Sequence, residues 1–135
     1  MRLASAELLA TCQAFAAERD PAALRRLVVA ETMRQSGSSI GRLFVLDDSK
    51  RTLLLAGSQI SGEESGRDDE RRVPLFFEGR RNTGHIAARC AFGGAPIVLE
   101  NVYATTGLDL KPVDRYDRLH RTRTRALMAV PLHDH

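Results

Sequence analysis

The hydrophobic period of this sequence changes clearly near Gly37. Before that point, apolar residues recur at helical spacing in residues 3–18 and again in the stretch that follows Asp20 and Pro21. Asp20 suits an N-cap, Pro21 suits the first helical position, and Gly37 suits the left-handed residue that ends a helix. After Gly37 most apolar runs are short and typical of strands. The sequence therefore predicts two helices followed by a region dominated by strands.

A hairpin is the clearest feature of the second region. Two β-rich runs, residues 40–46 and 52–56, flank a polar turn, and a polar stretch at 57–72 predicts an exposed loop. We further expect strands at 73–77, 97–99 and 126–132, a helix at 82–92 capped by Asn82, a loop at 103–113 and a short helix at 114–120. Because helices and strands are partly segregated, an α+β fold with an antiparallel sheet fits better than a doubly wound parallel sheet.

Length and composition narrow the class of protein. The chain has 135 residues, of which 43% are hydrophobic, enough for the core of one domain. No apolar run approaches the roughly 18 residues that span a bilayer, and Glu7 interrupts the apolar stretch that a signal peptide would need. The formal net charge is +3, with acids mixed among the bases over most of the chain. We therefore expect a cytoplasmic protein without a membrane or nucleic-acid partner.

The residues that usually carry enzyme or metal chemistry show no organised pattern. Cys12 and Cys90 have no zinc-type spacing, and both lie in helix-like apolar patterns that predict buried thiols. His85 lacks a second ligand at helical spacing, and His133 with His135 would make only a weak two-ligand site at the chain end. Phosphate-loop, nucleophile-elbow and zincin motifs are absent from the sequence. We therefore expect no catalytic residue, no metal and no cofactor.

Several short motifs in the second half of the chain point to one family. They are Val73-Pro74-Leu75, Glu78-Gly79-Arg80-Arg81-Asn82, the run from Pro96 to Tyr103, the pair Tyr116-Asp117, and the run from Arg123 to Leu132. Together they resemble a GAF domain, most closely those attached to bacterial adenylate cyclases, diguanylate cyclases and HD-GYP phosphodiesterases. The resemblance extends over the whole chain in element order and is most specific from residue 73 onward.

The resemblance implies a PAS-like architecture. An antiparallel sheet would carry the two N-terminal helices on one face. On the other face, short helices and loops, here 82–92 and 103–121, would cover a small-molecule pocket. Such a roof opens at low cost because few buried contacts are broken. GAF domains continue past the Pro-Leu pair into a further strand and a helix, so we expect residues 1–135 to be one GAF domain that is incomplete at its C-terminus. Its uncovered strand edges would favour low stability or self-association.

The functional expectation follows from the same resemblance. It implies a regulatory sensory module of a bacterial signal-transduction protein that controls a fused cyclase, phosphodiesterase or kinase, and that forms a homodimer through its terminal helices. The ligand contacts that we expect are Asn101, Asp109, Asp117 and Thr124 as polar groups, Tyr116 as an apolar wall, and Arg123 or Arg125 against an anionic group. The cyclic-nucleotide-binding members carry Glu where this chain has Arg118. Asp117 could instead cap its helix or pair with Arg121, and Thr124 could be an ordinary strand residue.

Other functions fit the same sequence. One is a dimerisation scaffold with an empty pocket. Another is an enzyme similar to the GAF-like reductases of free methionine-R-sulfoxide, which use an attacking and a resolving thiol in the pocket. Cys12 would lie on the wrong side of the sheet for that chemistry and would leave Cys90 alone. A third is a chromophore or haem sensor: bilin-binding relatives attach their chromophore through a Cys beside a His, and the sequence has no such pair, whereas His85 or His120 could ligate haem although nothing marks either one.

Overall fold

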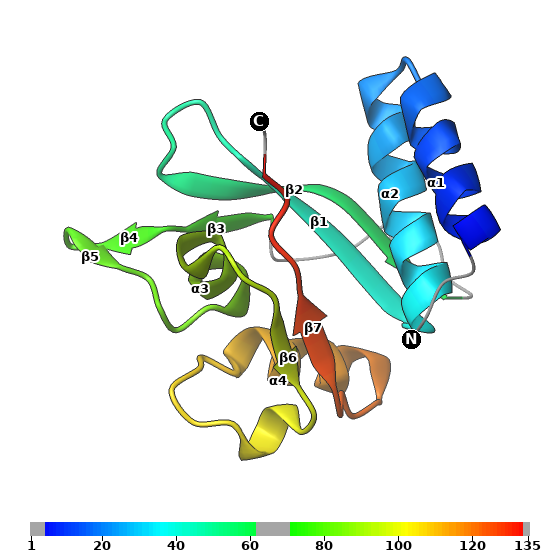
Figure 1. Cartoon of the computed structure of the whole chain (residues 1–135). Coiled ribbons are helices and arrows are strands. Elements are labelled where there is room, and N and C mark those ends of the chain that lie inside the picture. The colour runs from blue at the N-terminus through cyan, green and yellow to red at the C-terminus, as the bar shows by residue number, and fades with distance from the viewer. Residues whose placement is uncertain (1–4, 62–70, 134–135) are drawn as a thin grey trace. The chain divides into compact units, whose positions relative to one another are not determined.

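The computed structural model describes residues 5–61 and 71–133, and it divides the chain into two compact units (Figure 1). The N-terminal unit comprises Met1–Val45 and Leu54–Arg71, and the C-terminal unit comprises Leu46–Leu53 and Arg72–His135. Within the described ranges no helix combines the length and the apolar character that crossing a bilayer requires.

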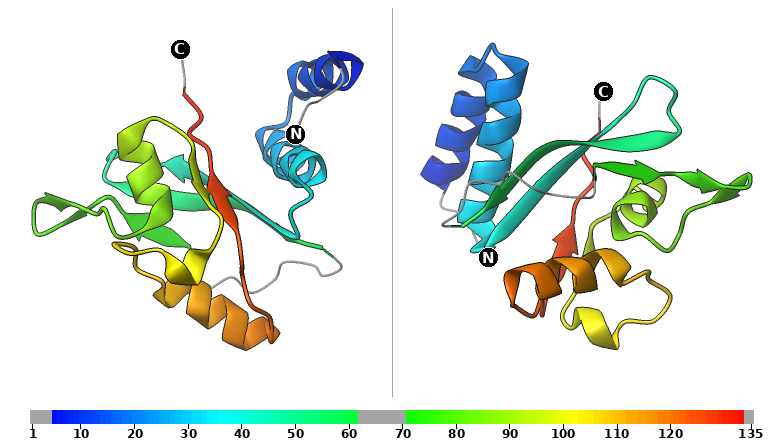
Figure 2. Two further views of the ribbon diagram at one scale, coloured as in Figure 1. Left: turned by 60° about the horizontal axis from the view of Figure 1, so that its bottom comes forward. Right: turned by 180° about the vertical axis from the view of Figure 1, so that it is seen from behind.

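The N-terminal unit begins with two helices that lie side by side (Figures 1 and 2): α1 (Ser5–Ala17) and α2 (Pro21–Ser36). The Asp20 carboxylate accepts hydrogen bonds from the backbone N–H groups of Ala22 and Ala23 at 3.4 and 3.3 Å. Gly37 ends α2 with φ of +69°. Both predicted helix boundaries around α2 are therefore confirmed, with the capping chemistry that the sequence indicated.

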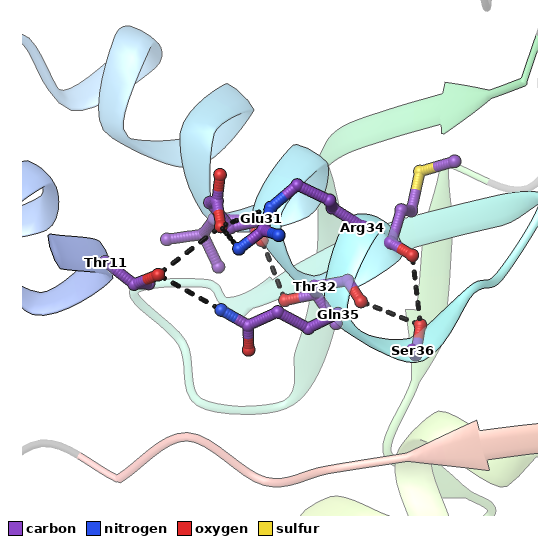
Figure 3. Close-up of polar contacts among 8 residues, drawn as sticks. Thr11, Glu31, Thr32, Arg34, Gln35 and Ser36 are labelled. Carbon is purple, nitrogen blue, oxygen red and sulfur yellow. Dashed lines mark hydrogen bonds and ion pairs between the residues drawn. The ribbon is translucent and has the colours of Figure 1, made fainter. Parts of the chain in front are cut away.

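Polar side chains tie α1 to α2 (Figure 3). Thr11 Oγ1 donates to Glu31 Oε2 at 3.4 Å and accepts from Gln35 Nε2 at 3.1 Å. The same Glu31 carboxylate holds Arg34, one turn along α2, at 3.0 Å. Cys12, next to Thr11, is exposed, so the prediction that it is buried is wrong. The apolar spacing predicted a helix but not that most of the α1 side chains would be exposed.

The hairpin is formed by β1 (Ile40–Leu46) and β2 (Thr52–Ile60), and α2 packs against it. The two glycines of the hairpin permit this close approach. A Cβ on Gly41 would lie 2.7 Å from Met33 Cγ, and one on Gly57 would lie 3.2 Å from Val29 Cγ2. Strand β2 continues four residues beyond its predicted end, so the loop expected at 57–72 is wrong for residues 57–60. Residues 62–70 of that expected loop lie outside the described residues.

The predicted strand 73–77 is broken into two pieces in the C-terminal unit. They are β3 (Arg72–Pro74) and β4 (Phe76–Phe77), and β4 pairs with β5 (Arg80–Arg81). Leu75 lies between the two pieces, and its N–H donates to Arg51 O while its carbonyl accepts from Asn82 N, both at 2.8 Å. Glu78 and Gly79 have φ of +49° and +77°, the left-handed values of a two-residue hairpin turn.

Helix α3 (Ile86–Gly93) begins four residues later than predicted. Its N-cap is His85, whose Nδ1 accepts from Ala87 N at 3.1 Å, and Gly94 ends it in the left-handed conformation as expected. The prediction that Asn82 caps this helix is wrong. The Asn82 side chain is buried: its amide donates to the carbonyl of Pro74 at 2.7 Å, and its Oδ1 accepts from the N–H of His85, the residue before α3, at 3.3 Å.

The remaining elements follow the predicted order with shifted ends. They are β6 (Ile97–Leu99), the 3-10 helix η1 (Val102–Ala104), α4 (Lys111–His120) and β7 (Leu127–Ala129). Helix α4 starts three residues earlier than expected, where the Asp109 carboxylate accepts from Lys111 N at 3.1 Å. Strand β7 is shorter than the predicted 126–132 because its ladder runs along the three residues of β6, antiparallel.

The α+β class with antiparallel sheets is confirmed. Over the two described ranges the strands sort into a three-stranded sheet of order β1-β2-β3 and the pairs β4-β5 and β6-β7, rather than one continuous sheet. In the N-terminal unit the core lies between α2 and the hairpin, with Val29 and Met33 buried. In the C-terminal unit the largest fully buried side chains are Val73 and Val102. The pocket implied by the resemblance stays a prediction.

Candidate functional site

The most constrained polar group of the C-terminal unit is Asp117, on the next-to-last turn of α4. Asp117 is only 5% exposed to solvent. Oδ2 accepts from Tyr103 Oη at 2.5 Å and from Thr124 N at 2.8 Å, and Oδ1 accepts from Thr124 Oγ1 at 2.7 Å. A buried carboxylate needs such donors to offset its lost hydration. Tyr103, Asp117 and Thr124, together with Arg123, are called the Asp117 cluster below.

Local backbone structure brings the members of the Asp117 cluster together. Arg121 takes the left-handed conformation that ends α4, with φ of +51°, and Thr122 N donates to Asp117 O at 3.0 Å. The chain therefore turns back at once, and Thr124 reaches the carboxylate seven residues earlier. Tyr103 comes from η1, where Val102 is buried and its N–H donates to Arg125 O at 2.8 Å. One carboxylate thus ties together η1, α4 and the segment that leads into β7.

Electrostatics keep Asp117 ionised. Burial alone would raise its pKa, but the hydrogen bonds from Tyr103 and Thr124 and the positive charge of Arg123 together hold the pKa below its usual value. The bond to the Asp117 carboxylate raises the pKa of Tyr103, and burial adds to this shift. At neutral pH the pair is therefore a charged acceptor and a neutral donor.

Arg123 is the exposed member of the Asp117 cluster. Its guanidinium carbon lies 4.3 Å from the centroid of the Tyr103 ring, a cation–π contact. In the part of the chain that the structure describes, no carboxylate is within ion-pair distance of Arg123. The remaining N–H groups of this planar fork suit a carboxylate or phosphate oxygen.

The structure places the predicted ligand residues in different surroundings. Asp117, Arg123 and Thr124 come together in the Asp117 cluster, whereas Asn101, Asp109 and Tyr116 lie outside its hydrogen bonds. Asn101 is exposed and its carbonyl accepts from Thr105 Oγ1 at 2.9 Å. The carboxylate of Asp109 caps the backbone at the start of α4.

Tyr116 stacks on His120 one turn along α4, with ring centroids 4.3 Å apart. Neighbouring helical residues point in directions about 100° apart, so Tyr116 and Asp117 face different ways. Thr124 is outside β7 and acts through its hydroxyl, so the alternative that it is an ordinary strand residue is wrong. The Asp117 carboxylate bonds to Tyr103 and Thr124 rather than capping its own helix.

Sequence reasoning missed two residues that organise this region. Tyr103 lies 14 positions before its partner Asp117, a separation with no periodic signal. Arg89 on α3 donates through Nε to Thr83 O at 2.7 Å and through Nη2 to Gly107 O at 2.6 Å. Arg89 thereby ties α3 to the loop that carries Asp109, whose N–H donates to Gly84 O at 2.7 Å.

Thiol and metal chemistry find little support in the geometry. Cys90 is buried, as predicted, and its Sγ lies 3.6 Å from Ala95 O. Burial raises the pKa of this thiol and disfavours the reactive thiolate. Across the described residues no three His, Cys, Asp or Glu side chains gather as a metal site. His135, half of the weak His pair noted in the sequence, lies outside the described residues.

Comparisons with known proteins address the fold. No protein-family model and no curated protein matches the sequence. Among solved structures, the GAF domain of a phosphoenolpyruvate-protein phosphotransferase (ptsP) from Coxiella burnetii superposes with a TM-score of 0.71 at 16% identity, covering 94% of this chain and 67% of that one. This chain has the GAF-domain fold.

A second solved structure supports the same conclusion. Residues 122 to 287 of a methyl-accepting chemotaxis protein superpose with a TM-score of 0.64, again at 16% identity, covering 94% of this chain and 74% of that one. At this identity the likeness concerns the fold alone. The GAF resemblance predicted from the motifs is therefore confirmed as a fold. The narrower resemblance to cyclase and HD-GYP domains stays a prediction.

Proposed function

We propose that this chain is a regulatory module of a signalling protein, in which a small molecule bound near the Asp117 cluster biases the activity of an attached output domain. The observation that carries the proposal is the cluster itself. A buried charged carboxylate holds Tyr103 and Thr124, and the exposed Arg123 stacks on the Tyr103 ring. The fold adds support, because the similar solved structures belong to a phosphotransferase and a chemotaxis protein. We place the module in the cytoplasm and, through its helices, in a homodimer.

The geometry suggests how binding would be coupled to conformation. Asp117 is buried and both of its oxygens accept hydrogen bonds from its own chain, so a ligand donor would reach this carboxylate by displacing Tyr103 or Thr124. Displacement would loosen η1 or the segment before β7 from α4. A ligand that favours one of two packings shifts their populations by its difference in affinity. An anionic group on the ligand would pair with the Arg123 guanidinium and so change its cation–π contact with the Tyr103 ring.

A thermal-shift screen with cyclic nucleotides, small metabolites and inorganic anions tests the proposal. A ligand at a hundred times its Kd stabilises the folded state by about 2.7 kcal/mol, which raises Tm by several degrees. Arg123→Ala should abolish most of that shift, since it removes the anion contact. Arg125→Ala is the matched control, because Arg125 is also exposed but contributes only its carbonyl to the hydrogen bonds described above.

A dimerisation scaffold without a ligand is the second candidate, and two observations favour it. Three donors of its own chain already bond to the buried Asp117 carboxylate. On α1, Leu8 and Leu9 are 50% and 59% exposed, as a helix that packs against a partner would be. This candidate would be selected if no compound in the ligand screen shifts Tm and if the protein is a dimer that Leu9→Glu dissociates.

Thiol-based reduction of methionine sulfoxide is the least supported function. The raised pKa of Cys90 opposes it, as does the exposure of Cys12 on a helix of the other unit. We propose that the chain is not an enzyme of this class. Turnover of free methionine-R-sulfoxide that is lost in Cys90→Ser would overturn this view.

A further inference from the structure

Four side chains of the C-terminal unit contact one another in a row, with two phenylalanine rings in the middle and an arginine at each end. The guanidinium carbon of Arg51 lies 4.8 Å from the centroid of Phe76. The rings of Phe76 and Phe92 meet edge to face, with centroids 5.5 Å apart and planes at 72°. The guanidinium carbon of Arg81 lies 4.9 Å from the centroid of Phe92. These four residues are called the arginine–phenylalanine ladder.

Backbone pairing fixes the ladder in place. Phe76 and Arg81 are opposite each other in the β4-β5 hairpin, which extends away from α3 in Figure 1. Phe92 is near the end of α3. Arg51 is held beside them because its carbonyl accepts from Leu75 N at 2.8 Å. The two guanidinium groups are therefore positioned by their contacts with rings that two strands, a helix and a turn hold in place.

The charges of the ladder are not neutralised. Other arginines of this protein pair on their own helices, Arg34 with Glu31 at 3.0 Å and Arg118 with Asp114 at 2.9 Å. In the described parts of the chain, no carboxylate forms an ion pair with Arg51 or Arg81, although both residues are exposed. A cation–π contact uses the face of a guanidinium, so its N–H edges stay available for oxygen acceptors.

The surrounding segment strengthens the positive field. Between residues 72 and 81 the sequence has Arg72, Arg80 and Arg81 against one acid, Glu78. Glu78 occupies the hairpin turn with a left-handed φ. The carboxylate of Asp47, near Arg51 in sequence, accepts from Ser49 Oγ at 2.7 Å and caps its own turn. Two guanidinium forks without an ion-pair partner among the described residues suit two carboxylates of one peptide.

We propose that the arginine–phenylalanine ladder is a docking surface for an acidic peptide segment of a partner protein, with one carboxylate on Arg51 and another on Arg81. The ladder fits a peptide better than single-stranded nucleic acid, because nucleic-acid platforms offer open ring faces to the bases. Here each phenylalanine ring already carries a guanidinium group. This surface is separate from the Asp117 cluster, so the proposal stands apart from ligand sensing.

Fluorescence anisotropy with a dye-labelled hexaglutamate peptide tests the docking surface on the full chain. Arg51→Ala and Arg81→Ala should each weaken binding by about tenfold, the effect of a lost charge-assisted hydrogen bond. Arg80→Ala is the matched control, since Arg80 neighbours Arg81 in β5 but is not part of the ladder, and it should change Kd by less than about twofold. Arg81→Lys should fail to restore wild-type binding, because lysine lacks the planar fork.

Three results would overturn the docking proposal. The first is the absence of binding to hexaglutamate by a folded wild-type chain. The second is an equal loss in Arg80→Ala and Arg81→Ala, which would indicate non-specific charge attraction. The third is tighter binding of a labelled oligothymidine than of hexaglutamate, which would assign the surface to nucleic acid. A thermal melt of each variant shows whether lost binding comes from lost folding, and Arg81→Lys serves as the folded substitute where an alanine variant fails to fold.

Discussion

At the scale of single residues, Asp117 shows how a buried charge can organise a small unit. One carboxylate satisfies three donors from η1 and from the chain after α4. The sequence singled out Asp117, Thr124 and Arg123 from motif position alone. It could not assign their partners, because Tyr103 has no fixed spacing to Asp117 and because the left-handed turn at Arg121 decides which groups return to it.

Asp117→Asn should destabilise the fold by about 2 kcal/mol. The amide keeps the shape of the carboxylate but loses the charge, and its NH2 group faces donors instead of acceptors. Chemical unfolding in urea measures the difference. Asp114→Asn is the control, because its pair with Arg118 is at the surface and should contribute about 0.5 kcal/mol or less. Equal losses of unfolding free energy in the two variants would show that the hydrogen bonds of Asp117 do not stabilise the fold.

The pH dependence of stability should carry the signature of the Asp117 carboxylate. Its pKa in the folded state is lowered from the ordinary 3.8, so the unfolded chain takes up this proton first as pH falls. The stability that Asp117 contributes is therefore fully present well above pH 3.8. It is lost as pH falls from there through the lower folded-state value.

Urea unfolding of wild type and Asp117→Asn between pH 7 and pH 3 measures that contribution. The difference between their free energies of unfolding should be constant down to about pH 5 and should shrink below about pH 4. A difference that grows on acidification would mean that the folded-state pKa is raised instead, and would contradict the hydrogen-bonded geometry.

At the scale of elements, the fit of α2 on the hairpin depends on two glycines. Gly41→Ala should destabilise the protein by about 1–3 kcal/mol, because the new methyl group would overlap Met33 and force α2 away from β1. Thermal unfolding followed by circular dichroism measures this loss. Gly93→Ala, where a Cβ meets no atom within 4 Å, is the control and should be neutral or slightly stabilising. Equal stability of the two variants would contradict the close packing.

Elements with strong local signals were predicted well, and those fixed by tertiary contacts were not. The caps of α2, the hairpin start and the glycine end of α3 follow from Asp20, Gly37 and Gly94. The N-cap of α3 was misplaced because the Asn82 side chain donates to the distant Pro74 carbonyl and its Oδ1 accepts from the N–H of His85, which is itself the cap. The β4-β5 hairpin was missed because strands of two residues are too short to show a period.

At the scale of the whole molecule, the GAF fold was recognisable from the order of elements and a few short motifs. At 16% identity to the solved structures reported above, few individual residues are shared, so ligand and partner do not follow from the fold. Their chemistry has to come from this chain's own side chains. Those side chains offer two candidate binding surfaces: the Asp117 cluster with its exposed Arg123, and the arginine–phenylalanine ladder.

The central claim, that a small molecule is sensed at the Asp117 cluster, is tested most directly by titration calorimetry. The ligand found by thermal shift is titrated into wild type, Arg123→Ala and Arg125→Ala. The account predicts about tenfold weaker binding to Arg123→Ala and nearly unchanged binding to Arg125→Ala. Equal affinity of all three proteins, or a folded wild type that binds nothing in the screen, would contradict it.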